Sequence, residues 1–276
     1  MTKQLLQLEH AKLYFSKTGT GDQVLLAFHG FGQSSEVFTA LSSSLSDSYT
    51  TYQFDIFFHG NSEWGLGEQP LEKEFWNRLM KNFLNEQSIS TFSLLGFSMG
   101  GKFALATLEA FPDSVKEVFL LAPDGIKTSM WYSLATYPVA LRNLFKSMIK
   151  KSNRFHAIAN SAFRIGLIDQ GILRFVESQM NTEEKRKRVY YAWVVFRHLK
   201  FNMASIARII NENNIRLVMI LGKFDKVITE KNMRNLLHKV KDYQLETLEA
   251  GHNAVVGASI PILSKNSYSK AGKANT

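Results

Sequence analysis

The sequence predicts an α/β protein, a three-layer α/β/α sandwich around a mostly parallel, eight-stranded sheet with an inserted helical cap. Three observations predict this class. Short apolar runs alternate with segments of helical spacing along most of the 276 residues, which is the pattern of a parallel sheet covered on both faces. The first two runs follow each other without a helix, so the sheet should begin with an antiparallel pair. The alternation stops once, from Gly125 to about Ser205.

The apolar runs predict the strands in order along the chain. Segments with helical spacing, such as 37–45, 71–84 and 229–240, lie between the later strands. The polar end of the chain, 264–276, carries no such period and is expected to be frayed. The eight predicted strands are 4–9, 11–16, 23–28, 50–57, 91–96, 116–122, 215–221 and 243–248.

The interruption predicts the domain organisation. Residues 1–126 and 206–276 should form the α/β core, and residues 127–205 should form a helical cap inserted into it. Large apolar residues recur through the cap, among them Tyr132 and Trp193. Most of them should build the cap's own core, because aromatic stripes at helical spacing are usually packing.

Positive charge is concentrated in the predicted cap. The whole chain has 33 Lys and Arg against 24 Asp and Glu, a net charge of +9, whereas residues 127–205 have fourteen against four, a balance of +10. The densest runs are 146–154 and 185–188. These runs predict a solvated helix face, with attraction to an anionic surface or substrate as the alternative. Nucleic-acid binding is not expected, because no recognised binding module accompanies the charge.

Composition narrows the chemistry further. The chain contains no cysteine, which excludes disulfides, thiol catalysis and cysteine-bound metal. Its first ten residues alternate polar and apolar side chains and lack the apolar core of a signal peptide. No stretch approaches the length of a membrane span. We therefore expect a soluble, cytoplasmic protein without cofactor or metal, with contact to a membrane surface as the less favoured alternative.

The most informative motif is Gly96-Phe97-Ser98-Met99-Gly100, which directly follows an apolar run. A serine between two glycines, where a strand turns sharply into a helix, is the pattern of a nucleophile elbow. The glycines let neighbouring backbone approach closely, and the amides at the start of the helix favour negative charge at the reacting atom. Ser98 is therefore the candidate nucleophile.

Three further segments follow predicted strands at the carboxyl end, where open α/β sheets build their sites. They are His29-Gly30-Phe31-Gly32, Gly222-Lys223-Phe224-Asp225 and Ala250-Gly251-His252. Because nucleophile, acid and histidine occur in this order, the chain resembles the α/β-hydrolase superfamily over nearly all of its length. The resemblance implies that the cap lies over the nucleophile and that the substrate site there is mostly apolar.

His252 is the candidate general base. A serine hydroxyl is a weak nucleophile until a base removes its proton, and a histidine suits that task. Among the seven histidines, His252 alone follows the last predicted strand. In the family, a histidine at the place of His29 is structural. His59 lies in a loop that only partly matches the family's D-x-x-G-x-G-x-S turn, because Phe58 replaces its first glycine.

Asp225 is the candidate acid that holds the histidine. A carboxylate at that place fixes the imidazole tautomer and stabilises the imidazolium that forms during attack. Asp225 lies four residues past Leu221 and 27 before His252. Asp124 competes, since some family members take the acid from after the sixth strand, but its Pro-Asp-Gly context is a strong turn signal. We favour Asp225.

Two backbone amides should form the oxyanion hole, those of Met99 after the nucleophile and of Phe31 in the His-Gly-Phe-Gly turn. Lys102 stands where carbon–carbon bond hydrolases of the superfamily often carry a basic residue. The simpler interpretation of Lys102 is a lysine on the surface of a helix.

The sequence thus predicts a serine hydrolase that cleaves carboxylic esters of small to medium hydrophobic substrates through an acyl-enzyme. A carbon–carbon bond hydrolase or lyase acting on an anionic diketone or enol acid would use the same triad, and the basic cap favours it mildly. Against it, Asn253 stands where ring-cleavage hydrolases usually have tryptophan. A non-catalytic receptor on the same fold ranks below both, because its usual marker is a missing triad member.

Overall fold

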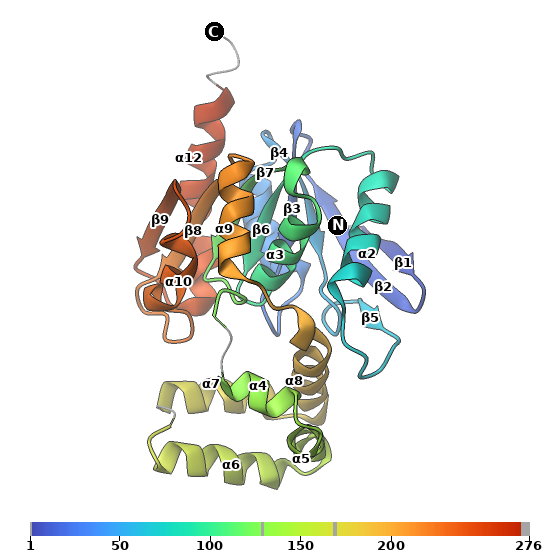
Figure 1. Ribbon diagram of the computed structural model, residues 1–276, viewed down its shortest axis with the longest axis vertical. Helices are drawn as coiled ribbons and strands as arrows, with labels where there is room; N and C mark the ends of the chain where they lie inside the picture. The colour runs from blue at the N-terminus through green and yellow to red at the C-terminus, as the bar shows by residue number, and fades with distance from the viewer. Residues whose placement is uncertain (1, 128–129, 168–169, 272–276) are drawn as a thin grey trace. The chain divides into compact units, whose positions relative to one another are not determined.

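The computed structural model describes residues 2–127, 130–167 and 170–271, and these fall into two compact units. Both units are drawn in Figure 1. The helical unit ends at His198, before the predicted cap boundary at residue 205, and it includes the short loop Leu66–Leu71, which no sequence pattern marked. The α/β unit comprises Met1–Gly65, Glu72–Lys127 and Leu199–Thr276, and the helical unit comprises Leu66–Leu71 and Thr128–His198.

The described part of the α/β unit contains a sheet in the order β1-β2-β4-β3-β6-β7-β8-β9, with β5 paired to β2. Strands β1 and β2 are antiparallel, and β2 is antiparallel to β4. The neighbouring strands β4, β3, β6, β7, β8 and β9 are all parallel. The mostly parallel sheet is therefore confirmed, and the two-residue β5 is an addition. The bounds are β1 (Lys3–Leu8), β2 (Ala11–Thr18), β3 (Gln23–Phe28), β4 (Tyr49–Phe54), β5 (Glu63–Trp64), β6 (Phe92–Phe97), β7 (Val115–Leu121), β8 (Arg216–Gly222) and β9 (Tyr243–Leu248).

Helices cover both faces of the sheet, as a three-layer sandwich requires. On one face α2 contacts α3, which contacts α9 and through it α10, while α1, α11 and α12 contact one another on the other face (Figure 1). The segment predicted to be frayed is helical as far as Ala271, and 272–276 lie outside the described residues. The bounds are α1 (Thr39–Ser44), α2 (Lys73–Glu86), α3 (Gly100–Ala110), α9 (Met203–Glu212), α10 (Glu230–Leu237), α11 (Val255–Ala258) and α12 (Ile260–Ala271).

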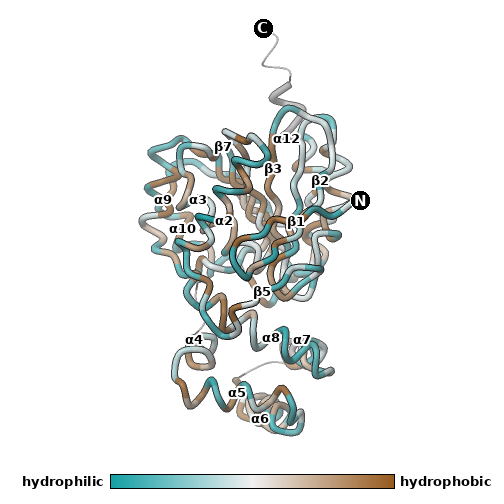
Figure 2. The backbone as a smooth tube through the Cα atoms, turned by 90° about the vertical axis from the view of Figure 1, so that its right-hand side faces the viewer, coloured by the Kyte–Doolittle hydropathy of each residue, from teal (hydrophilic) through white to brown (hydrophobic). Residues whose placement is uncertain are grey.

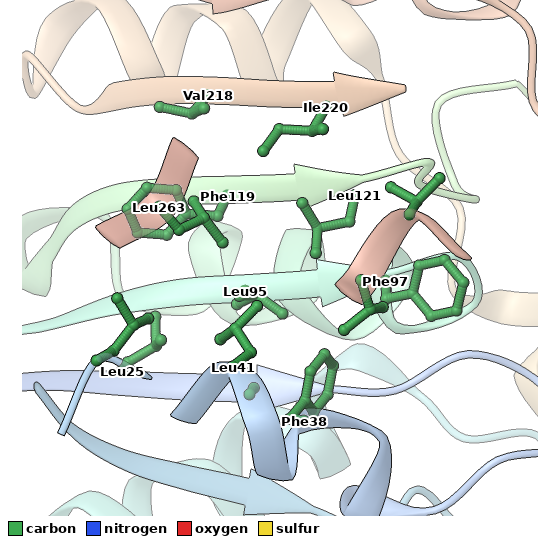
Figure 3. Packing of buried hydrophobic residues seen from close by; sticks show 14 of the residues in the cluster. Leu25, Phe38, Leu41, Leu95, Phe97, Phe119, Leu121, Val218, Ile220 and Leu263 are labelled. Atoms are coloured by element: carbon green, nitrogen blue, oxygen red, sulfur yellow. The ribbon is translucent and has the colours of Figure 1, made fainter. Parts of the chain in front are cut away.

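Alternation along the central strands supplies both layers of the core. On β3, Leu25 and Ala27 pack in one cluster with Phe38 next to α1, as Figure 3 shows for Leu25 and Phe38. Phe28 faces the opposite side and meets Trp76 of α2 edge to face, with ring centroids 5.8 Å apart. Successive side chains of a strand point to opposite faces of the sheet. The hydropathy colouring of Figure 2 accordingly places brown stretches in the interior of this unit.

The helical unit has a small core of its own. Ile149, Tyr190 and Val194 are buried together, and Phe145 packs against them. No helix in the described part of the chain is both long and apolar enough to cross a membrane. The helices are α4 (Met130–Thr136), α5 (Val139–Lys150), α6 (Ser152–Arg164), α7 (Gln170–Met180) and α8 (Glu183–Val195).

Arg186 corrects the interpretation of the run 185–188 as a uniformly solvated helix face. Its side chain is buried, and it donates from Nε to the carbonyl of Ile149 at 2.8 Å and from Nη1 to the carbonyl of Met180 at 2.9 Å. These carbonyls belong to the last turns of α5 and α7, where helix carbonyls lack partners within the helix. Arg186 thus joins three helices.

Candidate active site

Ser98 occupies a sharp turn between β6 and α3. Its φ of +50° lies in the left-handed region that side chains rarely adopt, which stores strain at this position. The turn is held because the amide of Ser98 donates to the carbonyl of Leu121 at 3.0 Å. A Cβ on Gly100 would lie 1.9 Å from the carbonyl oxygen of Phe28, so this position admits only glycine. The local geometry is therefore that of a nucleophile elbow.

The turn after β7 supports the same elbow. The amide of Asp124 donates to the carbonyl of Ser98 at 2.8 Å, and the carboxylate of Asp124 lies 3.1 Å from Nζ of Lys102. Lys102 is buried rather than a surface lysine, which corrects the simpler interpretation of this residue. Gly125 also donates to Asp124, at 2.7 Å. The carboxylate of Asp124 is thus engaged by Lys102 and by its own turn.

His252 lies between Ser98 and Asp225. Its Nδ1 is 2.5 Å from Oδ2 of Asp225, and its Nε2 is 2.9 Å from Oγ of Ser98. A carboxylate can only accept, so Nδ1 carries the proton and Nε2 is left to accept the serine hydroxyl. The three residues, which are widely separated in sequence, form one hydrogen-bonded chain in the order acid, base and hydroxyl.

The carboxylate of Asp225 is fixed by its own loop. The amides of Val227 and Ile228 donate to Oδ1 at 2.7 and 2.9 Å, and the residue is buried at the end of β8. Because these two amides occupy Oδ1, Oδ2 is the oxygen that meets the imidazole. The loop therefore sets the direction from which the carboxylate approaches His252.

The amides of Phe31 and Met99 donate to no acceptor in the described part of the chain. The Phe31 turn is held by His29, which accepts from the amide of Ile56 at Nε2 (2.9 Å) and therefore donates from Nδ1 to the carbonyl of Gly30 (2.7 Å). His29 is buried and uses both ring nitrogens to hold the backbone of this turn, which is a structural role. The two amides are available to an oxyanion, as an oxyanion hole requires.

Asp55 organises the neighbouring loop, a role that sequence reasoning missed. Its carboxylate accepts from Nζ of Lys3 at 2.7 Å and from the amides of Ser35 and Asn61 at 2.8 and 3.1 Å. Burial by itself raises the pKa of Asp55, but these hydrogen bonds outweigh it and hold the pKa below the usual value. The feature of the sequence that could have indicated this role is that Asp55 stands at the first position of the D-x-x-G turn motif.

His59 of that loop lies against the Phe31 turn. The ring of His59 lies 5.1 Å from the ring of Phe31, centroid to centroid, and His59 is within 3.0 Å of the carbonyl of Phe57. Phe58 has a φ of +68°, the left-handed conformation for which the family's turn uses glycine. Within the described residues, no group of three or more His, Asp or Glu side chains could hold a metal ion.

The fold and this geometry define a class of protein. The family model described as "alpha/beta hydrolase fold" matches residues 23–258, which is most of the chain. The chain belongs to the α/β hydrolase fold family.

Individual proteins are similar to parts or all of the chain. A thermophilic esterase from Thermogutta terrifontis, solved with malate bound, superposes with a TM-score of 0.70 at 18% identity and full coverage of both chains. The dihydrolipoyllysine-residue acetyltransferase component of the acetoin cleaving system of Cupriavidus necator is 27% identical over 44% of this chain and 32% of its own. A pimeloyl-[acyl-carrier protein] methyl ester esterase of Nitrosomonas europaea is 24% identical over 52% of this chain and 56% of its own. The matches thus span 32% and 56% of the length of these two curated relatives.

Proposed function

We propose that this protein is a serine hydrolase that cleaves carboxylic esters. The observation that carries the proposal is the chain of hydrogen bonds from Asp225 through His252 to Ser98, at 2.5 and 2.9 Å. The amides of Phe31 and Met99, which donate to no acceptor among the described residues, supply the other element that acyl transfer needs. The similarity to two esterases supports the same reaction class.

In this mechanism Oγ of Ser98 attacks the ester carbonyl carbon while its proton passes to Nε2 of His252. The carbonyl oxygen becomes an oxyanion that accepts from the amides of Phe31 and Met99. The C–O bond to the alcohol then breaks, and His252 returns the proton to the leaving alkoxide. Water activated by His252 hydrolyses the resulting acyl-enzyme. Asp225 stabilises the imidazolium in both halves of the reaction.

We further propose that the substrate is small to medium in size and apolar around the ester. The loop that carries Asp225 exposes two apolar side chains, Phe224 and Val227, on either side of it. Large apolar side chains exposed beside a reactive group are suited to bind an apolar substrate. Each methylene buried in the transition state would contribute about 0.8 kcal/mol until the available surface is filled.

A panel of p-nitrophenyl esters of increasing chain length tests this proposal, with a diketone acid beside them as the substrate of a carbon–carbon hydrolase. The expected result is that kcat/KM rises from acetate to medium-chain esters and that Ser98→Ala abolishes it. A fluorophosphonate probe should label the wild type at Ser98 and leave Ser98→Ala unlabelled. Labelling retained in that variant, or turnover of the diketone acid alone, would overturn ester hydrolysis through Ser98.

A further inference from the structure

The end of helix α6 exposes an unusual group of apolar side chains. Ile165 is 70% exposed, the highest value for a large apolar residue in the described part of the chain, Leu167 is 50% exposed and Ile158 is 46% exposed. Phe163 adds a fourth at 40%. Ile158 and Ile165 lie seven residues apart, on one side of the helix, and Leu167 follows on the turn after it. Exposed apolar side chains grouped in this way mark contact sites, whereas single exposed apolar residues need no explanation. Figure 2 shows brown and teal stretches mixed along the α5 and α6 segment.

A helix cap holds these side chains in place. The amide of Gly166 donates to the carbonyl of Phe163 at 3.0 Å, and the amide of Leu167 donates to the carbonyl of Ala162 at 2.9 Å. Gly166 has a φ of +72°, so it takes the left-handed conformation that ends a helix in this way. Ile165 and Leu167 are therefore presented on either side of a fixed turn.

Exposed cations lie at both ends of α6, Lys151 and Arg154 at its start and Arg164 next to the apolar turn. Lys151, Arg154 and Arg164 are exposed, and no carboxylate among the described residues lies within ion-pair distance of them. Arg154, Ile158 and Ile165 follow each other at intervals of four and seven, which places them along one side of α6. Other cations of the same unit form ion pairs: Lys146 and Arg142 share Glu68, Lys187 pairs with Glu183, and Arg188 pairs with Glu184.

We propose that this surface, the exposed side of α6 with the turn at residues 165–167, docks on an anionic phospholipid bilayer. Aliphatic side chains on a fixed turn can enter the headgroup region, and the exposed cations of α6 can bind the anionic headgroups. This combination matches how interfacial segments bind without crossing a membrane. The proposal does not depend on ester hydrolysis, because none of these residues belongs to the candidate active site.

Charge favours a lipid surface over a second copy of this chain. Residues 66–71 and 128–198 contain twelve Lys and Arg against five Asp and Glu, a balance of +7. Two such surfaces facing each other would repel, whereas an anionic bilayer offers a continuous field of opposite sign. Attraction of this origin is screened by salt.

Flotation with vesicles tests the proposal. Wild-type protein should float with vesicles of equimolar phosphatidylcholine and phosphatidylglycerol, and much less with phosphatidylcholine alone. High salt should weaken the binding. The double variant Ile165→Asp/Leu167→Asp should bind at least tenfold more weakly, while Val139→Asp, at an equally exposed aliphatic residue of α5, serves as the matched control and should bind as the wild type does.

A second pair of variants isolates the charge contribution. Arg154→Gln/Arg164→Gln should lower the affinity for the anionic vesicles severalfold, whereas Arg208→Gln, an exposed arginine on α9, should not. Circular dichroism and turnover of a soluble ester establish that all variants are folded. No binding by the wild type, equal losses in Val139→Asp, or a dimer in sedimentation that Ile165→Asp/Leu167→Asp dissociates would each overturn the proposal. The last result would instead assign the surface to contact between copies.

Discussion

The α/β unit and the helical unit bury their apolar side chains to different extents. Of the thirteen large apolar residues that the described part of the chain exposes, nine lie between Leu134 and Leu167 of the helical unit and four in the much longer α/β unit. Charge divides the same way. The helical unit carries a balance of +7, which leaves +2 of the total +9 for the α/β unit.

This difference separates two tasks. The α/β unit places Ser98, Asp225 and His252 at the ends of strands that a close-packed core holds in position. Preorganised groups of this kind need rigid support. The helical unit instead keeps apolar and cationic side chains at its surface, where they can bind something outside the chain. Substitutions should therefore affect turnover or global stability in the first unit, and binding in the second.

After Ser98→Ala, the largest effect should come from Asp225. Replacing it by asparagine removes the carboxylate that fixes the His252 tautomer, so Asp225→Asn should lower kcat on the order of a thousandfold or more. Asp124→Asn should cost far less, because Asp124 contacts Lys102 and its own turn. Steady-state kinetics on one ester for both variants provides the check. The reverse ranking would move the acid to the loop after β7.

Matched phenylalanines should reveal the difference in packing. Phe28→Ala, in the fully buried core of the α/β unit, should lower the free energy of unfolding by about 3–5 kcal/mol. Phe163→Ala, at an exposed position of the helical unit, should change it by about 0.5 kcal/mol or less. Urea denaturation measures both. A large loss at Phe163 would mean that this residue is part of a core after all.

Replacing a buried carboxylate of the α/β unit should lower the free energy of unfolding more than replacing a half-exposed carboxylate of the helical unit. Asp55→Asn should cost about 1–3 kcal/mol at neutral pH, because it removes a buried acceptor of three hydrogen bonds. Glu68→Gln should cost about 0.2–1 kcal/mol, since the side chain of Glu68 is 29% exposed, whereas that of Asp55 is fully buried.

The pH dependence of the Asp55 effect follows from the direction of its pKa. The folded pKa lies below the unfolded value of about 3.9, so the contribution is fully present above about pH 5 and is lost as the pH falls through the folded pKa. The difference in unfolding free energy between the wild type and Asp55→Asn should therefore shrink in acid. A difference that stays constant down to the folded pKa would contradict this account.

The smallest effects should be the same in both units. Thr182 caps α8 by accepting from the amide of Lys185, and Asn202 caps α9 by accepting from the amides of Ala204 and Ser205. Each replacement by alanine should cost about 1 kcal/mol, because a cap acts locally whatever the core beneath it. Hydrogen exchange should locate the loss for Thr182→Ala in the helical unit. Protection lost throughout the α/β unit would show that the two units unfold together.

Local patterns were sufficient to predict the strands and the elbow. The eight predicted strands match observed ones to within a few residues at either end. Most of them contain a short apolar run that is typical of a buried strand, whereas β1 and β9 are only partly buried. The glycines on either side of Ser98 similarly indicate that other backbone approaches closely there, and all five residues of this motif are consecutive in the sequence. Chain order then predicted which aspartate and which histidine the structure brings to Ser98.

Contacts between distant residues decided the rest. The pairing of Lys102 with Asp124, the burial of Arg186 and the role of Asp55 each depend on partners that no local pattern identifies. From sequence alone a charged residue is expected to be exposed to solvent, and only the fold shows that a partner from elsewhere in the chain binds it. Ile165 shows the opposite case. An apolar residue at helical spacing is expected to be buried, but no other element in the described part of the chain covers Ile165, which is 70% exposed. Sequence therefore determined the elements and their order, and tertiary structure determined which side chains water reaches, because burial is a property of the whole packed chain.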